Sequence, residues 1–408
     1  MAEQHEKALV PQIRFTGFTD PWEQRKLGEV ARRVTRKNEN GDSDLPLTIS
    51  AQYGLVDQRT FFNSQVASKD MSGYFLLHRG EFAYNKSTST DSPWGAIKRL
   101  EKYDMGCVST LYICFELLSG DPDFLVTYYE TDRWYKSVQL IAAEGARNHG
   151  LLNIAPDDFF ETQICIPKRI DEQRRIGAFF DRLDSLITLH QRKYDKLCVL
   201  KKSMLDKMFP KGGSLYPEIR FAGFTDPWEQ RKLGEVAHFI NGRAYSQNEL
   251  LSSGKYPVLR VGNFYTNDSW YYSNLELEDK NYAYEGDLLY TWSATFGPHI
   301  WHGNKVIYHY HIWKVQLEAA LEKLFAFQLL ERDKERILSD KNGSTMVHIT
   351  KTGIENTSVL MPCSVEEQRR IGAFFDRLDS LITLHQRKYC GVVSWMLGVA
   401  LVRLSSEK

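Results

Sequence analysis

Hydrophobic positions in residues 171–209 recur with the spacing of a helix that has one apolar face. Apolar side chains fill the a, d and e positions of successive heptads, from Ile176 through Met208. This spacing predicts one long amphipathic helix with a face wide enough for coiled-coil pairing. Pro210 and the Gly-Gly-Ser run at 212–214 predict the end of the helix and a hinge after it.

Residues 366–408 begin with the same apolar face. Two helices of one sequence, each with an apolar stripe to cover, most simply bury these stripes against each other. The copy changes after Tyr389, where Gly391 and Gly398 each weaken a helix by up to about 1 kcal/mol relative to alanine. The side chains expected to line the seam between the helices are Ile176, Phe179, Leu183, Leu186, Ile371, Phe374, Leu378 and Leu381.

The segments before the two helices mix short strand patterns with helical ones. Strands are predicted at 111–115 and 306–315, and helices at 123–141 and 318–339, separated by Gly, Asn, Asp and Ser. Each segment therefore reads as a compact domain of mixed α and β structure, which places the chain in the α+β class. The expected organisation is a first domain at 1–170, a helix at 171–211, a second domain at 212–365 and a helix at 366–408.

Two sequence blocks occur twice in the same order. Residues 11–31 return at 217–237 with 19 of 21 positions identical, and residues 172–194 return unchanged at 367–389. Between these blocks the copies diverge, although anchors such as Tyr84 and Tyr290 stay aligned. Such an arrangement indicates a duplicated unit of about 200 residues. One scaffold carrying two different interiors suggests that the chain reads two different things.

Composition and charge exclude several classes of protein. The 408 residues are 42% hydrophobic and 25% charged, so the chain is not wholly disordered or fibrous. The 52 basic and 52 acidic residues cancel, which excludes a uniformly basic coat for nucleic acid. The start lacks a secretory signal pattern, and the longest apolar run, 392–402, is too short to span a bilayer. The six cysteines lie far apart in the sequence, so we expect them to be reduced thiols. We also expect a cytoplasmic location and no association with a membrane.

Motifs for catalysis are missing from the sequence. There is no GxxxxGK[ST] loop, no GxGxxG after a strand, no Asn-Pro-Pro-aromatic tetrapeptide of amino-methyltransferases, and no HExxH, GxSxG or paired CxxC. The best metal candidate is a group of histidines beside several aromatic residues, in which two members would share one face of a strand. A packed sheet or contacts with bases are the preferred readings, and no metal is expected at His299, His302, His309 and His311.

Polar loops supply the candidate contacts with nucleic acid. Hydroxyl, amide and ammonium groups follow Tyr84, and hydroxyls follow its counterpart Tyr290, where they suit phosphates and base edges. Exposed polar loops are the alternative reading. Aromatic residues at 264–272 could stack on bases, although core packing is the more common role. The candidate DNA-binding residues are Lys86, Ser87, Thr88, Arg147, Asn148, Arg243, Ser293, Thr295, Lys341, Asn342 and Ser344.

The whole chain resembles the specificity subunit of type I restriction-modification systems. The resemblance rests on PWEQRKLGEV at the head of each half, EQRRIGAFFDRLDSLITLHQRK at each end, and KKSMLDKMFP at 201–210. It implies two target recognition domains, each reading half of a bipartite asymmetric site on double-stranded DNA. It also implies that the two helices pair antiparallel and set the distance between the half-sites.

The resemblance further assigns the chemistry to other chains. Two methyltransferase subunits would methylate adenines with S-adenosylmethionine, and restriction subunits would add translocation and cleavage that use ATP and Mg²⁺. The chain itself would be non-catalytic and would carry no cofactor. Two alternatives stay open from the residues alone: a coiled-coil scaffold without sequence readout, and a solo DNA-modifying enzyme with unfamiliar motifs.

Overall fold

The computed structural model describes residues 10–50, 53–63, 67–90, 92–142, 150–265, 268–293, 295–339 and 350–404. The chain divides into two compact units. The first comprises residues 1–188 together with 392–408, and the second comprises 189–391. Within the described residues, no helix is long and apolar enough to cross a bilayer.

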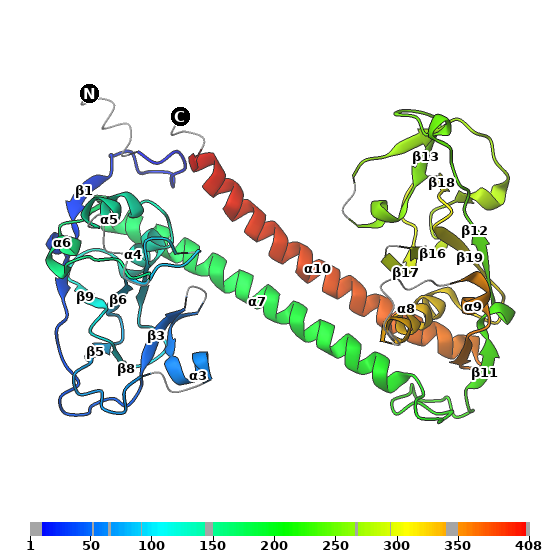
Figure 1. Cartoon of the computed structure of the whole chain (residues 1–408), viewed down its shortest axis with the longest axis horizontal. Coiled ribbons are helices and arrows are strands. Elements are labelled where there is room, and N and C mark those ends of the chain that lie inside the picture. The colour runs from blue at the N-terminus through cyan, green and yellow to red at the C-terminus, as the bar shows by residue number, and fades with distance from the viewer. Residues whose placement is uncertain are drawn as a thin grey trace. The chain divides into compact units, whose positions relative to one another are not determined.

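The first unit is built on an antiparallel four-stranded sheet in the order β2-β9-β6-β7, accompanied by three two-stranded pairs, β1-β10, β3-β4 and β5-β8 (Figure 1). Its elements are β1 (Glu23–Lys26), α2 (Leu27–Val30), β2 (Ala31–Arg33), β3 (Leu47–Ser50), β4 (Gly54–Asp57), α3 (Gln58–Phe62), β5 (Phe75–His78), β6 (Phe82–Asn85), β7 (Ala96–Arg99), β8 (Met105–Val108), β9 (Ile113–Leu117), α4 (Pro122–Tyr129), α5 (Tyr135–Ile141), α6 (Pro156–Phe160), β10 (Gln163–Ile166) and the first part of α7 (Ile170–Met208).

The second unit repeats this plan with the sheet β12-β19-β16-β17, a second sheet β14-β13-β18-β15 and the pair β11-β20. Its elements are β11 (Glu229–Lys232), η1 (Leu233–Glu235), β12 (Ala237–Asn241), η2 (Gln247–Glu249), β13 (Tyr256–Leu259), η3 (Val261–Phe264), β14 (Tyr271–Ser273), η4 (Asp279–Asn281), β15 (Tyr282–Ala283), β16 (Leu288–Ser293), β17 (Thr295–Ile300), β18 (Val306–Tyr308), β19 (Ile312–Leu317), α8 (Lys323–Ser339), α9 (Lys351–Glu355), β20 (Ser358–Met361) and α10 (Val365–Leu404), whose last turns belong to the first unit.

The sheets β2-β9-β6-β7 and β12-β19-β16-β17, one in each unit, keep one register. Ala31 faces Leu117 and Ala83 faces Cys114 in the first unit, while Ala237 faces Leu317 in the second. Tyr84 and Tyr290, aligned by sequence, are both fully buried in the cores of their units. The α+β class and the duplicated scaffold are confirmed.

Three element predictions were wrong in detail. The helix predicted at 123–141 is two helices, because Thr131 Oγ1 donates to the Tyr128 carbonyl (2.7 Å) and Trp134 Nε1 donates to the Tyr129 carbonyl (3.0 Å) where the first helix ends. The strand predicted at 306–315 is split into β18 and β19 by a turn. The helix predicted from 318 begins only at Lys323, at the start of α8.

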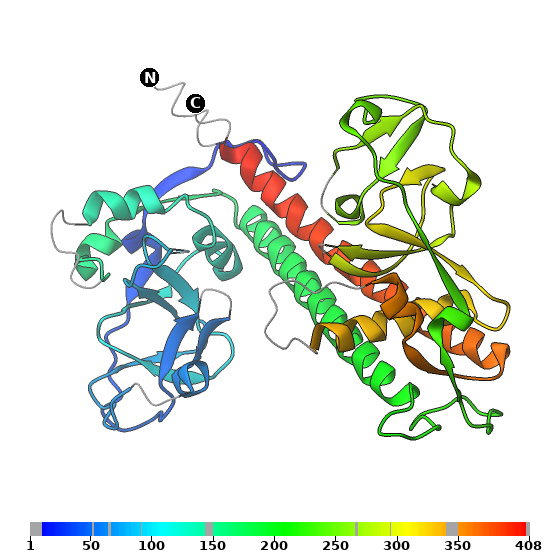
Figure 2. The same cartoon turned by 45° about the vertical axis from the view of Figure 1, so that its right-hand side comes forward.

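Within the second unit, the last part of α7 and α10 lie side by side and run in opposite directions (Figures 1 and 2). His190 contacts His385, Lys201 Nζ lies 2.6 Å from Asp379 Oδ1, and Phe209 packs near Phe375. Along the pair, residue numbers on α10 therefore decrease as those of the α7 segment increase, which confirms that the helices are antiparallel. Helix α10 continues through both glycines to Leu404.

The predicted seam needs a correction. Ile371, Phe374 and Leu378 do pack with α7, but against its last turns, in a core that also contains Met208 and Phe325 of the second domain. Ile176 packs instead against the core of the first domain. Because antiparallel helices bring the start of one to the end of the other, the identical segments meet only near their ends, at His190 and His385. Phe179 packs on Phe15, Leu183 is half-buried, and Leu186 and Leu381 are exposed.

The repeated blocks form the same buried ion pair in both units, which we call the clamp. Glu172, at the start of α7, accepts two hydrogen bonds from Arg14 (2.6 and 2.7 Å) and one from Trp22 Nε1 (3.3 Å). Glu367, at the start of α10, accepts the matching bonds from Arg220 (2.7 and 2.8 Å) and Trp228 Nε1 (3.3 Å). The head block and the helix block are therefore repeated together because each supplies half of the clamp.

Replacement of Gly177 or Gly372 by alanine is expected to destabilise its unit. An added Cβ would lie 2.7 Å from the backbone nitrogen of Phe124 in the first case and of Phe325 in the second. Overpacking of this kind costs about 1–3 kcal/mol. Gly391 is the matched helical control, since a Cβ there meets nothing within 4 Å and alanine adds up to about 1 kcal/mol of helix stability. Thermal unfolding checks this, and equal midpoints for all three variants would contradict it.

The helix pair is expected to lose stability as pH falls. His190 Nδ1 and His385 Nδ1 are 2.9 Å apart, so one ring donates and the other must accept without a proton there. The pKa of His385 is lowered below its ordinary value, first by burial and then by the electrostatic effect of His190, Lys193 and Lys388. A histidine whose pKa is lower in the folded state than in the unfolded state favours folding fully only above the unfolded pKa of about 6.5. This contribution to the free energy of unfolding is lost as the pH falls below that value.

The measurement is the thermal midpoint at about pH 8 and about pH 5.5. His385→Gln is expected to show a smaller acid-induced drop than the wild type, because it removes one titrating ring. An identical drop in both proteins would mean that other groups account for the acid sensitivity.

Candidate nucleic-acid interface

In the second unit, three of the residues predicted to contact DNA, Arg243, Ser293 and Thr295, lie at one end of the sheet β12-β19-β16-β17. Ser293 ends β16 and Thr295 begins β17, so both lie at the tip of one hairpin, and both are half-buried. The turn between β18 and β19, residues 309–311, lies beside them. Trp292 joins the two, because its Nε1 donates to the Tyr310 carbonyl (2.9 Å) and its backbone N–H donates to the His311 carbonyl (3.2 Å).

Arg243 lies beside the same turn, because it follows the end of the neighbouring strand β12. It forms a β-bridge with His309, and its Nη2 donates to Glu249 Oε1 (2.6 Å). The bond from Arg243 is the main cause that lowers the pKa of Glu249 to about 2. The guanidinium also lies over the ring of Tyr245 (5.2 Å to the centroid), so Arg243 is held in place by a carboxylate and an aromatic face.

The histidines of this turn are uncharged at neutral pH. Burial, with His311 and Arg260, lowers the pKa of His309 to about 4, and burial lowers the pKa of His311. Arg260 lies over the Tyr271 ring (4.3 Å). Tyr310 is 39% exposed. Neutral imidazole carries one donor and one acceptor, so the turn offers both kinds of group beside a cation and an exposed phenol.

Sequence reasoning missed the position of these groups. It treated His309 and His311 as residues on one face of a strand, because it read 306–315 as continuous, and it did not consider Arg260. A turn residue in a long apolar run is hard to detect from periodicity. Among the described residues, no group of three or more His, Cys, Asp or Glu gathers closely enough to hold a metal ion. His299 stacks on Phe264 instead (4.1 Å).

In the first unit, the predicted loop follows β6 at the corresponding end of the sheet. Thr88 Oγ1 donates to the Gly150 carbonyl (3.0 Å), and Ser87 is exposed. Lys86 is half-buried, its Nζ donates to the Ile154 carbonyl (3.3 Å), and burial lowers the pKa of its ammonium. A role in DNA contact stays a prediction for these residues. Arg147, Asn148, Lys341, Asn342 and Ser344 lie outside the described residues.

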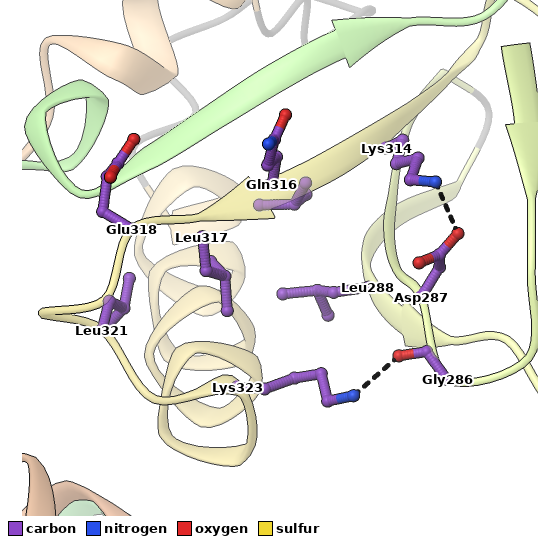
Figure 3. Close-up of a pocket in the computed structure, with 10 residues that line it drawn as sticks. Gly286, Asp287, Leu288, Lys314, Gln316, Leu317, Glu318, Leu321 and Lys323 are labelled. Atoms are coloured by element: carbon purple, nitrogen blue, oxygen red, sulfur yellow. Dashed lines mark hydrogen bonds and ion pairs between the residues drawn. The ribbon is translucent and has the colours of Figure 1, made fainter. Parts of the chain in front are cut away.

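A pocket of about 350 Å³ opens elsewhere in the second unit, between β16, β19 and the start of α8 (Figure 3). Two lysines line it, but both ammonium groups already have protein partners. Lys314 Nζ is 2.7 Å from Asp287 Oδ2, and Lys323 Nζ donates to the Gly286 carbonyl (2.9 Å). These bonds leave the pocket without a cation poised for an anionic ligand.

A known family model matches most of the second repeat. Residues 225–391 match the model of the type I restriction modification DNA specificity domain. The matched residues include the sheet β12-β19-β16-β17, the β18–β19 turn and the first part of α10. The first half of the chain repeats this framework.

Two curated specificity subunits are similar to parts of this chain. It is 26% identical over 171 residues to the type I restriction enzyme MjaVIII specificity subunit of Methanocaldococcus jannaschii, covering 41% of this chain and 39% of that protein. It is 23% identical over 231 residues to the putative type I restriction enzyme MjaX specificity subunit of the same organism, covering 54% and 53%. The chain thus spans between two fifths and about half of the length of these curated relatives. The resemblance to specificity subunits is confirmed.

A solved structure supports the fold. The S subunit of the type I restriction-modification system from M. genitalium superposes with a TM-score of 0.60 at 15% identity, over 96% of this chain and 97% of that one. At this identity the likeness concerns the fold alone.

Proposed function

We propose that this chain recognises a bipartite, asymmetric site on double-stranded DNA, one half with each unit. The observation that carries the proposal is the equivalence of the two candidate interfaces. One sheet register is kept in both units, while the polar groups at one sheet end differ: Lys86, Ser87 and Thr88 in the first, Ser293, Thr295 and the histidine turn in the second. A constant scaffold with different surface groups is what two readers of different sequences require.

The chain acts by recognition, and catalysis belongs to its partners. Methyltransferase subunits would modify adenines with S-adenosylmethionine, and restriction subunits would use ATP and Mg²⁺, all in the cytoplasm. Catalytic motifs are missing from this sequence, and residues 225–391 match the model of a specificity domain. Both facts favour recognition over a solo modifying enzyme.

Two copies of one methyltransferase fit the surface of the helix pair. Leu189 on α7 is 45% exposed and its copy Leu384 on α10 is 44% exposed. They flank the histidine pair, which joins one residue to its own repeat and therefore marks a local two-fold relation within the second unit. Equivalent exposed leucines on two related helices suit two identical partners. Native mass measurement of the assembled complex should show two methyltransferase chains for each copy of this protein.

The deciding experiment is selection from a pool of random duplex DNA with the full chain, alone and with a methyltransferase subunit from the same host. Two enriched sequence blocks separated by an unread spacer are expected. Methylated adenines in the selected sequences, after addition of S-adenosylmethionine, would assign the modification to the partner. A chain that assembles with the methyltransferase but enriches no sequence would be a scaffold, and methylation by the chain alone would identify an enzyme.

A further inference from the structure

The turn before the strand β9 and the turn before the strand β19 occupy the same place in the two units. Ala83 faces Cys114 in the first sheet, and Leu289 faces Lys314 at the matching position in the second. Residues 109–112 therefore enter the first sheet where residues 309–311 enter the second. Each turn also lies at the sheet end that carries the predicted polar groups, since Tyr84 pairs with Ile113 and Thr291 pairs with Ile312.

The chemistry at this shared position differs sharply. In the second unit the turn presents two neutral imidazoles, with the Arg260 guanidinium close enough to lower the pKa of His309. In the first unit the turn carries no charge: Thr110 is exposed, Leu111 is 56% exposed, and Ser109 Oγ accepts from the Leu111 backbone N–H (3.3 Å). The Leu111 side chain and the Thr110 side chain are therefore accessible at this end of the sheet.

The net charge of the second domain does not account for attraction to DNA, so the charged group beside the second turn matters. Residues 212–365, which hold the second domain without the long helices, contain 15 Lys and Arg against 18 Asp and Glu, so this domain does not attract DNA by its net charge. Attraction must come from a local group of donors. Arg260 lies on the face of Tyr271, and its Nη2 donates to the Ser269 carbonyl (3.1 Å). Its neighbour Leu259 accepts a hydrogen bond from the His309 backbone N–H (3.0 Å), so Arg260 supplies a cation beside the histidine turn.

We propose that the β8–β9 turn and the β18–β19 turn are the base-reading elements of the two units, an assignment that rests on the proposed function. Arg260 would bind the O6 and N7 acceptors of guanine, and His309 and His311 would bind neighbouring base edges through one donor and one acceptor each. In the first unit, the Leu111 side chain and the Thr110 methyl group would pack on thymine methyl groups, and the Thr110 hydroxyl would bond a base edge.

The test repeats the duplex selection with full-length variants. Arg260→Ala and the double variant His309→Ala, His311→Ala are expected to lose about ten-fold to hundred-fold of the base preference at one to three positions of a single half-site, guanine among them for Arg260. Thr110→Ala with Leu111→Ala is expected to relax only the other half-site, at thymine positions. Matched controls are His302→Ala and Leu118→Ala, exposed residues outside the turns, which should leave both half-sites unchanged.

Arg260→Lys separates reading from folding and from charge. It keeps the cation and hence the salt dependence of binding, but loses the planar fork, so guanine preference should fall as it does with alanine. A melting temperature equal to that of the wild type shows that the fold is intact. A wild-type motif that survives unchanged in the turn variants overturns this assignment alone. A wild-type chain that enriches no motif overturns the proposed function and the assignment with it.

Discussion

Glu367→Ala is expected to destabilise the second unit by about 3–5 kcal/mol, because it leaves the Arg220 guanidinium, whose side chain is only 14% exposed, without its anion. The carboxylate of Glu367 is buried at the start of α10, where it accepts both bonds from Arg220 and the bond from Trp228 Nε1. Loss of the carboxylate also frees the first turn of α10 from the head of the second repeat. Against a typical stability of 5–15 kcal/mol, such a loss unfolds much of the unit at physiological temperature.

The neighbouring residue supplies the control. Glu366 sits one position earlier, is half-exposed, and pairs with Arg369 (2.5 Å) and Arg370 (3.3 Å) on the helix surface. Glu366→Ala should change stability by no more than about 1 kcal/mol, because solvent screens exposed pairs. Hydrogen exchange, read separately for residues 10–188 and 189–391, locates the damage. Glu172→Ala should act in the same way on the first unit, and equal effects of Glu366→Ala and Glu367→Ala would refute the clamp.

Phe209→Ala is expected to cost about 3–5 kcal/mol by opening a cavity where α7 enters the second domain. The ring is 1% exposed and stacks on Phe325 (5.6 Å between centroids), with Trp228 edge-on at 5.6 Å. Arg332 covers it from outside, with its guanidinium 5.1 Å from the ring centroid and a bond to the Pro210 carbonyl (3.1 Å). The same substitution therefore weakens both the domain core and the anchoring of the helix.

Val199→Ala is the matched control, since Val199 lies on α7, the helix that Phe209 follows, and is 70% exposed. It should shift the free energy of unfolding by no more than about 0.5 kcal/mol. Denaturant unfolding gives the two values, and hydrogen exchange over residues 201–209 reports the anchoring. Normal protection of this segment in a destabilised Phe209→Ala variant would show that the domain core is affected but that the helix is held by other contacts.

Local patterns in the sequence were enough to predict the long helix and the duplicated scaffold. The a, d and e spacing from Ile176 to Met208 was enough to predict α7, because an exposed helix must place its apolar residues on one face. The repeated blocks were enough to predict two copies of one scaffold, since identical segments in the same order fold alike. The candidate residues after Tyr84 and Tyr290 could be aligned for the same reason.

Contacts distant in the sequence were decided by the tertiary structure alone. Glu172 looks like an ordinary helix-surface acid in the sequence, and only its meeting with Arg14, 158 positions away, makes it a buried anchor. Lys86 looked like a free cation until the Ile154 carbonyl was found beside it. The histidine turn was invisible because apolar residues on both sides suggested one strand. Periodicity reports which face of an element is buried, whereas pairing between distant segments decides which polar groups meet, and the candidate interface depends on the second.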